Sequence, residues 1–145
     1  MFDELDKYIL GFTLEDLATD YWYDEGVDIA EKMLYKFADN DWKILLEIVS
    51  ERTIEWQRCL AYCMHNGHDL NQLRVLLRLA DTDDIELFEI VVDSLRGFTD
   101  QESLSLIQNN PQIISKVKEL LPKSGDAVKK IFEEFLKQQV NISKP

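Results

Sequence analysis

The stretch KILLEIVSERTIEWQRCLAYCMHNG at residues 43–67 aligns without gaps with RVLLRLADTDDIELFEIVVDSLRGF at residues 74–98, at an offset of 31 residues. Eleven of the 25 aligned columns are apolar in both rows, among them Leu45 with Leu76 and Leu60 with Val91. Each row predicts a short helix, a polar turn and a longer helix. Because one such pair cannot cover its own apolar stripe, we predict two stacked helical hairpins. Chance helical periodicity is the alternative explanation of the match.

The rest of the chain also has the periodicity of helices. Apolar residues recur at spacings of three and four nearly throughout, and alternation does not extend beyond four residues. Thr13, Thr53 and a capping box formed by Thr99 and Glu102 predict helix starts. We therefore predict a single all-α domain of about nine helices. Its predicted parts are an acidic N-terminal cap (1–41), two hairpin repeats (42–98) and C-terminal cap helices (99–145).

The repeat length narrows the kind of helical stack. A period of 31 residues is shorter than the ankyrin and tetratricopeptide repeats, and neither T-P-L-H nor W-x-x-L-G occurs in the chain. Residues 42–98 resemble the HEAT-like family of helical hairpin repeats. This resemblance implies a short solenoid or bundle whose atypical end segments close the stack.

The charge of the chain points to a type of partner. The net charge is −12, and residues 1–31 hold ten acids against the single base Lys7. Like charge repels phosphate, so direct binding of nucleic acid or an anionic membrane is disfavoured, whereas a basic protein would be attracted. Solubility alone is the alternative reason for this composition. Two cysteines, no apparent signal peptide and no long apolar run predict a cytoplasmic protein outside the membrane.

The residues with reactive or metal-binding side chains do not form a recognisable catalytic site. Cys59, Cys63, His65 and His68 are all possible zinc ligands, but the two cysteines lie on one apolar helical stripe, which favours core packing. The serines have no histidine base on another element. We therefore predict no metal, no cofactor and no enzymatic activity.

A stretch of aromatic and acidic residues, TDYWYDEG at 19–26, is the first candidate for a partner-binding surface. Its three consecutive rings cannot all face one core, so Tyr23 is expected to point outward among carboxylates. Aromatic side chains supply buried anchors at protein interfaces, and acids attract a cationic partner. The second candidate is the acidic turn at 81–84, although helix capping also explains its aspartates. The predicted partner-binding residues are Asp20, Trp22, Tyr23, Asp24, Glu25, Asp28, Asp81, Asp83 and Asp84.

A small acidic helical protein with such a surface resembles the immunity proteins of bacterial toxin–immunity systems, including polymorphic toxin and contact-dependent inhibition systems. The resemblance implies that the partner is a cognate, basic toxin domain such as a nuclease, whose active site or exosite the protein covers. The competing hypothesis is an adaptor or regulatory subunit that binds a peptide or protein along the repeats. A HEAT-like DNA glycosylase is a more remote alternative, since the charge of the chain has the wrong sign for holding DNA.

Overall fold

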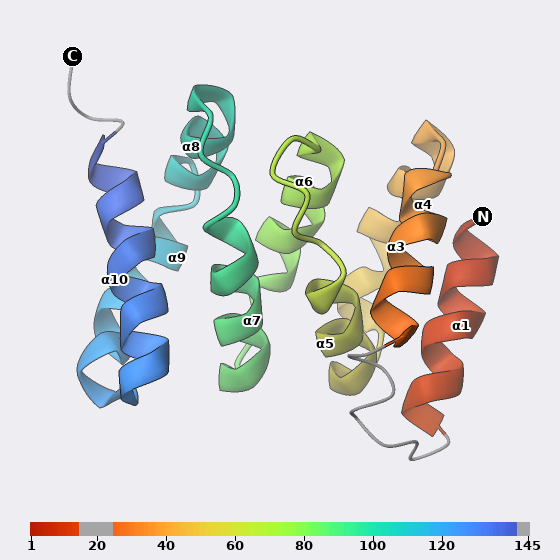
Figure 1. The fold of residues 1–145 in the computed structure, drawn as a ribbon, viewed down its shortest axis with the longest axis horizontal. Coiled ribbons are helices and arrows are strands. Elements are labelled where there is room, and N and C mark those ends of the chain that lie inside the picture. The colour runs from red at the N-terminus through yellow and green to blue at the C-terminus, as the bar shows by residue number, and fades with distance from the viewer. Residues whose placement is uncertain (15–24, 142–145) are drawn as a thin grey trace.

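The computed structural model describes residues 1–14 and 25–141, which form nine α-helices, two short 3-10 helices and no strand (Figure 1). The predicted all-α fold is confirmed. The 3-10 helices are Val49–Glu51 after α4 and Leu121–Lys123 after α9. The α-helices are α1 (Phe2–Leu14), α3 (Val27–Tyr35), α4 (Asp39–Ile48), α5 (Ile54–Tyr62), α6 (Leu70–Leu79), α7 (Ile85–Leu95), α8 (Gln101–Gln108), α9 (Pro111–Leu120) and α10 (Asp126–Asn141).

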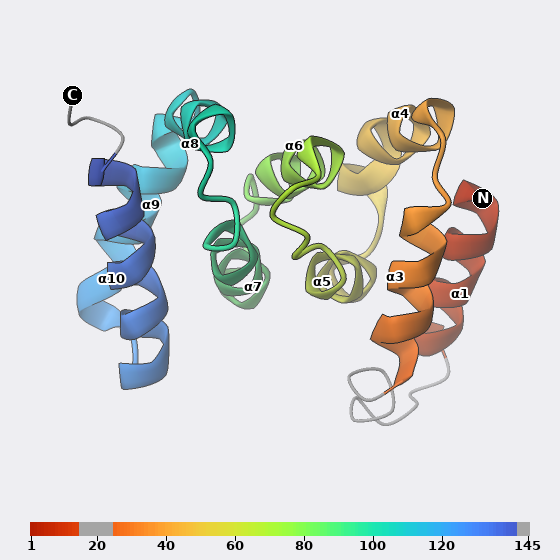
Figure 2. The same cartoon turned by 45° about the horizontal axis from the view of Figure 1, so that its top comes forward.

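The helices form a stack of hairpins two layers deep (Figures 1 and 2). In one layer α6 lies between α4 and α8, and in the other α7 lies between α5 and α10. At the N-terminal end α1 packs against α3 and α5, and at the opposite end α9 packs against α8 and α10. Because each hairpin packs against its neighbours, the apolar core runs the length of the stack between the two layers.

The boundaries of the helices follow the 31-residue repeat. Helices α4 and α6 have the same length and begin 31 residues apart, as do the first residues of α5 and α7, Ile54 and Ile85. Leu45, Leu60, Leu76 and Val91 are all completely buried. The two predicted hairpins are therefore confirmed, but the predicted order of a short and a longer helix is wrong in the first, where α4 has 10 residues and α5 has 9. Helix α8 begins a further 31 residues after α6, but α9 begins 26 residues after α7, so the period ends within the third hairpin.

Side-chain caps explain where several of these helices begin. The hydroxyl of Thr53 accepts a hydrogen bond from the Trp56 backbone N–H at 3.2 Å, which confirms the predicted start of α5. The capping box predicted at Thr99 and Glu102 is wrong. Asp100 is the cap of α8, and its carboxylate accepts from both the backbone N–H of Ser103 at 2.8 Å and the Ser103 hydroxyl at 2.9 Å. Each of the two carboxylate oxygens thus accepts one donor of Ser103, the backbone N–H on one oxygen and the hydroxyl on the other.

The helix start predicted at Thr13 is also wrong. Thr13 lies in the last turn of α1, where its hydroxyl donates to the Leu10 carbonyl at 3.1 Å, the local bond that threonine commonly makes within a helix. Helix α1 instead begins at Phe2, whose backbone N–H donates to the Asp41 carboxylate at 3.1 Å. The other oxygen of Asp41 accepts the Ala38 N–H at 2.9 Å, so one side chain joins the starts of α1 and α4.

The cysteines belong to the core, as their apolar stripe predicts. Cys63 is buried and Cys59 is half-buried against the core cluster. Burial, followed by the nearby charge of Glu55, raises the pKa of the Cys59 thiol to about 11, and burial raises that of Cys63 well above its ordinary value. Over the described ranges, no helix combines the length and the apolar character needed to cross a membrane.

Candidate protein-binding groove

A groove of about 540 Å³ crosses the layer formed by α5, α7 and α10 and reaches the start of α3. Apolar side chains from all four helices form its floor and walls, so a bound segment would bury apolar surface there. The described residues that line the groove are Val27, Tyr62, His65, Glu86, Glu89, Ile90, Asp93, Ser94, Val128 and Ile131.

Helix α7 supplies the acidic side of the groove. Leu87, Phe88 and Val91 of this helix are completely buried in the core. Helical periodicity therefore places Glu86, Glu89 and Asp93, three and four residues apart, along its outer face. Ile90 lies beside them, so carboxylates and apolar surface alternate along the same helix.

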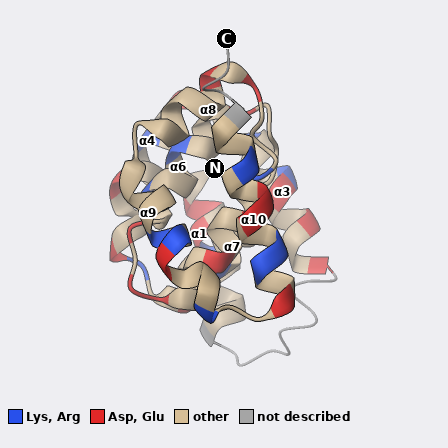
Figure 3. Cartoon of the chain, turned by 90° about the vertical axis from the view of Figure 1, so that its left-hand side faces the viewer, with Lys and Arg blue, Asp and Glu red and all other residues tan. Residues whose placement is uncertain are grey.

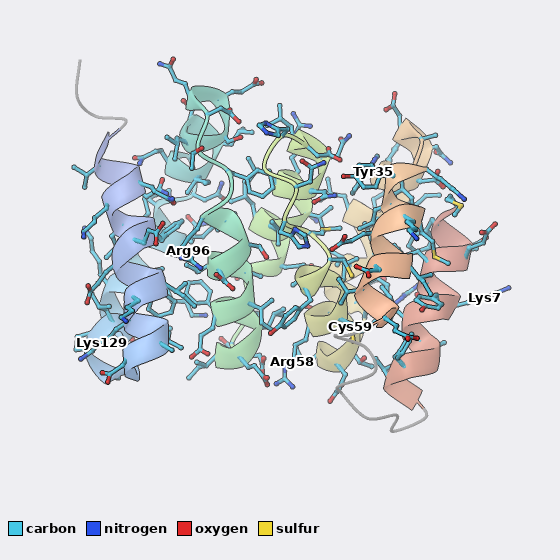
Figure 4. All side chains as sticks on the ribbon, in the orientation of Figure 1. Lys7, Tyr35, Arg58, Cys59, Arg96 and Lys129 are labelled. Atoms are coloured by element: carbon cyan, nitrogen blue, oxygen red, sulfur yellow. The ribbon has the colours of Figure 1, made fainter. Side chains whose placement is uncertain are left out.

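Two arginines neutralise the carboxylates at the ends of this row (Figure 4). Arg58 of α5 makes a two-pronged ion pair with Asp84, the cap of α7, at 2.7 and 3.0 Å. Its remaining nitrogen lies 3.1 Å from Glu86. At the other end of α7, Arg96 pairs with Asp93 and, at 3.1 Å, with Glu134 of α10. Both guanidinium groups are thus already paired with carboxylates of the chain, and the buried Nε atom of Arg96 has no hydrogen-bond partner among the described residues.

Glu89, between these two pairs, has no partner among the described residues. Its side chain is half-buried in the groove wall, and no described cation or hydrogen-bond donor contacts its carboxylate. Burial raises the pKa of Glu89 above its ordinary value, and the negative charges of Glu86 and Asp84 add to this effect. Among the three groove carboxylates, Glu89 is therefore the one that a cation from outside the chain could pair with without displacing an arginine.

His65 borders the groove on the side of α3 and is paired there with Glu31. The Nε2 atom of His65 lies 2.6 Å from a carboxylate oxygen of Glu31, which connects α3 to the turn after α5. His65 also lines a second hollow of about 300 Å³, together with Tyr35 of α3, whose ring is the most exposed large apolar side chain described. The groove and this hollow therefore meet at His65, which lines both.

The structure places part of the first predicted binding surface beside the groove. Glu25 and Asp28 are exposed, and Val27 between them lines the groove. These two predicted residues therefore lie next to the groove, where it reaches the start of α3. The other residues predicted in this surface, Asp20, Trp22, Tyr23 and Asp24, lie outside the described residues.

The second predicted surface, the acidic turn at 81–84, lies away from the groove. Asp81 and Asp83 are exposed and border a different hollow, next to Lys116 of α9. Lys116 lies 4.6 Å from the centre of the Phe88 ring and donates to the Thr82 carbonyl, which fastens the turn to α9. Asp84 caps α7 through the Leu87 N–H at 2.8 Å, as the capping explanation predicted.

Sequence reasoning missed the acidic row of α7. The available signal was its spacing, with Glu86, Glu89 and Asp93 on one helical face opposite the buried stripe. The repeat alignment also pairs Glu86 with Glu55, but the alignment was judged by its apolar columns, so the acidic positions received no weight. Part of the apolar lining comes from α3 and α10, which are distant from α7 in sequence, so the groove itself could not be recognised before the helices were assembled.

The C-terminal end of the stack has a different charge distribution. Viewed end-on, lysines and carboxylates are interspersed over α9 and α10 (Figure 3). From Lys116 onward the sequence contains seven lysines and four acids, against one base and ten acids in residues 1–31. The negative charge of the sequence is therefore concentrated toward the N-terminal end, and a cationic partner would be drawn to that end.

The fold and the groove define a class of protein, an all-α stack of helical hairpins that carries an acid-lined groove across one layer. None of the known protein families, curated proteins or solved structures compared with the chain matches it.

Proposed function

We propose that the protein binds a basic protein partner over the groove, and that this partner is a toxin domain that the protein neutralises. The observation that carries the proposal is the composition of the groove. The described residues lining it include three carboxylates and no lysine or arginine, over an apolar floor. Such a surface combines the two features of a specific interface with a cationic protein, desolvated apolar contact and complementary charge.

The mechanism is occlusion without chemistry in this chain. A toxin that acts on nucleic acid holds phosphates in a basic cleft, and the carboxylates of α7 would occupy the positions of those phosphates or bind an adjacent site. The net charge of −12 accelerates the encounter, because an acidic protein and a basic cleft attract each other over about a Debye length. Neutralisation of such a toxin inside the producing cell fits a cytoplasmic protein.

The second candidate function is an adaptor that binds a basic peptide in the same groove. The observation favouring it is that the groove is an open hollow lined by α3, α5, α7 and α10, which suits an extended or helical segment laid across the repeats. In this case the partner is a segment of another protein and no toxin is involved.

The gene neighbourhood supplies the experiment, because immunity genes lie directly downstream of their toxins. The C-terminal domain encoded by the upstream reading frame is expressed with and without this protein, and growth and binding by isothermal titration calorimetry are measured. We expect toxicity that the protein relieves and a stable complex. The double variant Glu86→Lys with Glu89→Lys should lose rescue. Its charge-matched control, Glu47→Lys with Glu119→Lys, changes exposed acids of α4 and α9 and should retain it.

A toxic upstream domain that this protein neither binds nor neutralises would remove the immunity proposal. Equal rescue by both double variants would leave the immunity function in place and show that the interface is not the groove.

A further inference from the structure

The position of Glu89 sets it apart from the other groove carboxylates. Arg58 pairs with Glu86 on one side of it, and Arg96 pairs with Asp93 on the other. Glu89 itself contacts no cation among the described residues, although an ionised carboxylate in a partly buried site is costly without one. Arginines therefore pair with the carboxylates at the two ends of the row, and Glu89 at its centre has no partner among the described residues.

The surroundings of Glu89 suit a long cationic side chain better than a small ion. Ile90 lies next to it on α7, and Val128 and Ile131 of α10 line the same groove. Lysine and arginine carry an apolar stem that packs on such surface while the charged head reaches a carboxylate. Arg58 and Arg96 are each paired with two carboxylates, so Glu89 is the one groove carboxylate left, among the described residues, to pair with a cationic head.

We infer that the groove is a recognition site for one arginine or lysine of an amphipathic segment of the partner, with the cationic head on Glu89 and the stem against Ile90 and Ile131. This inference rests on the proposed function and names the chemistry of the partner segment. Charge complementarity commits it to a cationic peptide rather than to an acidic or purely apolar one.

A synthetic probe tests the inference without knowledge of the natural partner. The probe is a capped helical peptide of leucine, alanine and glutamine with a single central arginine. Matched peptides carry lysine or the neutral isostere citrulline at that position. Each is titrated by calorimetry into the native chain, into Glu89→Gln and into the control Glu47→Gln, which removes an exposed carboxylate of α4 in the other layer. Circular dichroism establishes that these proteins, and the further variant Ile131→Gln, are folded.

For the native chain and Glu47→Gln we expect the arginine peptide to bind at least about tenfold more tightly than the citrulline peptide, with the lysine peptide close to arginine. On Glu89→Gln the arginine and citrulline peptides should bind within about twofold of each other, because the pairing charge is gone. A variant of the apolar lining, Ile131→Gln, should weaken the binding of all three peptides together, since it removes the apolar surface on which the stem packs.

Two results would overturn the inference. One is an absence of measurable binding of the arginine peptide to the native chain, and the other is an arginine preference that persists unchanged in Glu89→Gln. Neither result concerns rescue from the upstream toxin, so failure of this site and failure of the immunity function are separate outcomes.

Discussion

A Cβ atom built on Gly67 would overlap the backbone carbonyl of Gly97. The turn after α5 and the turn after α7 therefore touch through their main chains, at equivalent places in the two repeats. Gly67 is needed here for space between backbones, and the close approach fixes the distance at which neighbouring hairpins stack.

The first prediction concerns this contact. Gly67→Ala should lower the free energy of unfolding by about 1–3 kcal/mol, because the backbone of the second turn must move to admit the methyl group. Urea denaturation followed by circular dichroism measures the change. The matched control is Gly11→Ala in α1, where a Cβ would meet nothing within 4 Å. This control should be neutral or more stable by up to about 1 kcal/mol, since alanine favours a helix. Equal effects of the two changes would contradict the contact.

The second prediction concerns Asp84, which both caps α7 and pairs with Arg58. Asp84→Ala should reduce the free energy of unfolding by about 1–2 kcal/mol at pH 7. Its neighbour Asp83→Ala, an exposed aspartate with no described partner, should change it by less than about 0.5 kcal/mol. Denaturant titrations of the three proteins give the comparison.

The effect of Asp84 should also depend on pH. Arg58 first, and then the Leu87 amide, hold the pKa of this carboxyl below its ordinary value. A lowered pKa in the folded state means that the stabilisation is complete above the unfolded value of about 3.9 and is lost as the pH falls through the folded value. The difference between native chain and Asp84→Ala should be constant from about pH 5 to 8 and shrink below about pH 4. A difference that stays undiminished at pH 2.5 would show that ionisation of Asp84 is not responsible.

The third prediction concerns the thiols. With a pKa of about 11, Cys59 is ionised to about one part in ten thousand at pH 7, and Cys63 is buried. Alkylation by iodoacetamide should therefore be much slower in the folded chain than in urea, where both thiols react as free cysteine. Mass spectrometry over time measures both rates. Elemental analysis of the same samples should find less than about one zinc per several chains, and tight zinc lost in Cys59→Ser would contradict the assignment of these cysteines to the core.

The fourth prediction concerns the acidic N-terminal surface. Lysine substitutions at Asp20, Asp24 and Asp28 should slow association with the upstream toxin domain, and the native rate should fall steeply with salt. Tyr23→Ala should instead act through faster dissociation, by about 2 kcal/mol or more if its ring is a packed anchor. Surface plasmon resonance separates the two rates. A triple lysine control at Glu47, Glu119 and Glu133, which are exposed on α4, α9 and α10, should associate nearly as fast as the native chain.

The sequence predicted the hairpins well because their signal is local. Leu45 and Leu76, or Leu60 and Val91, repeat the same burial at the same spacing, and Thr53 caps α5 as expected. The start of α8 was misjudged because Thr99 and Asp100 are adjacent residues that can both cap, and only the assembled turn shows which one does. The groove depends on how α3 and α10 are placed against α7, which no local pattern encodes.

Arg58 and Arg96 also constrain how this surface can diversify among related chains. Each arginine pairs with two acids, one that lines the groove and one that links two helices. Arg58 pairs with Glu86 in the groove and with Asp84, the cap of α7. Arg96 pairs with Asp93 in the groove and with Glu134 of α10. A substitution at either arginine therefore has two effects at once. It changes the charge of the groove, and it removes an ion pair that joins neighbouring helices. Glu89 contacts none of the described side chains in this way, so it can change without such a penalty. We expect descendants that acquire a new partner to vary first at position 89, while the two ends of α7 remain the same.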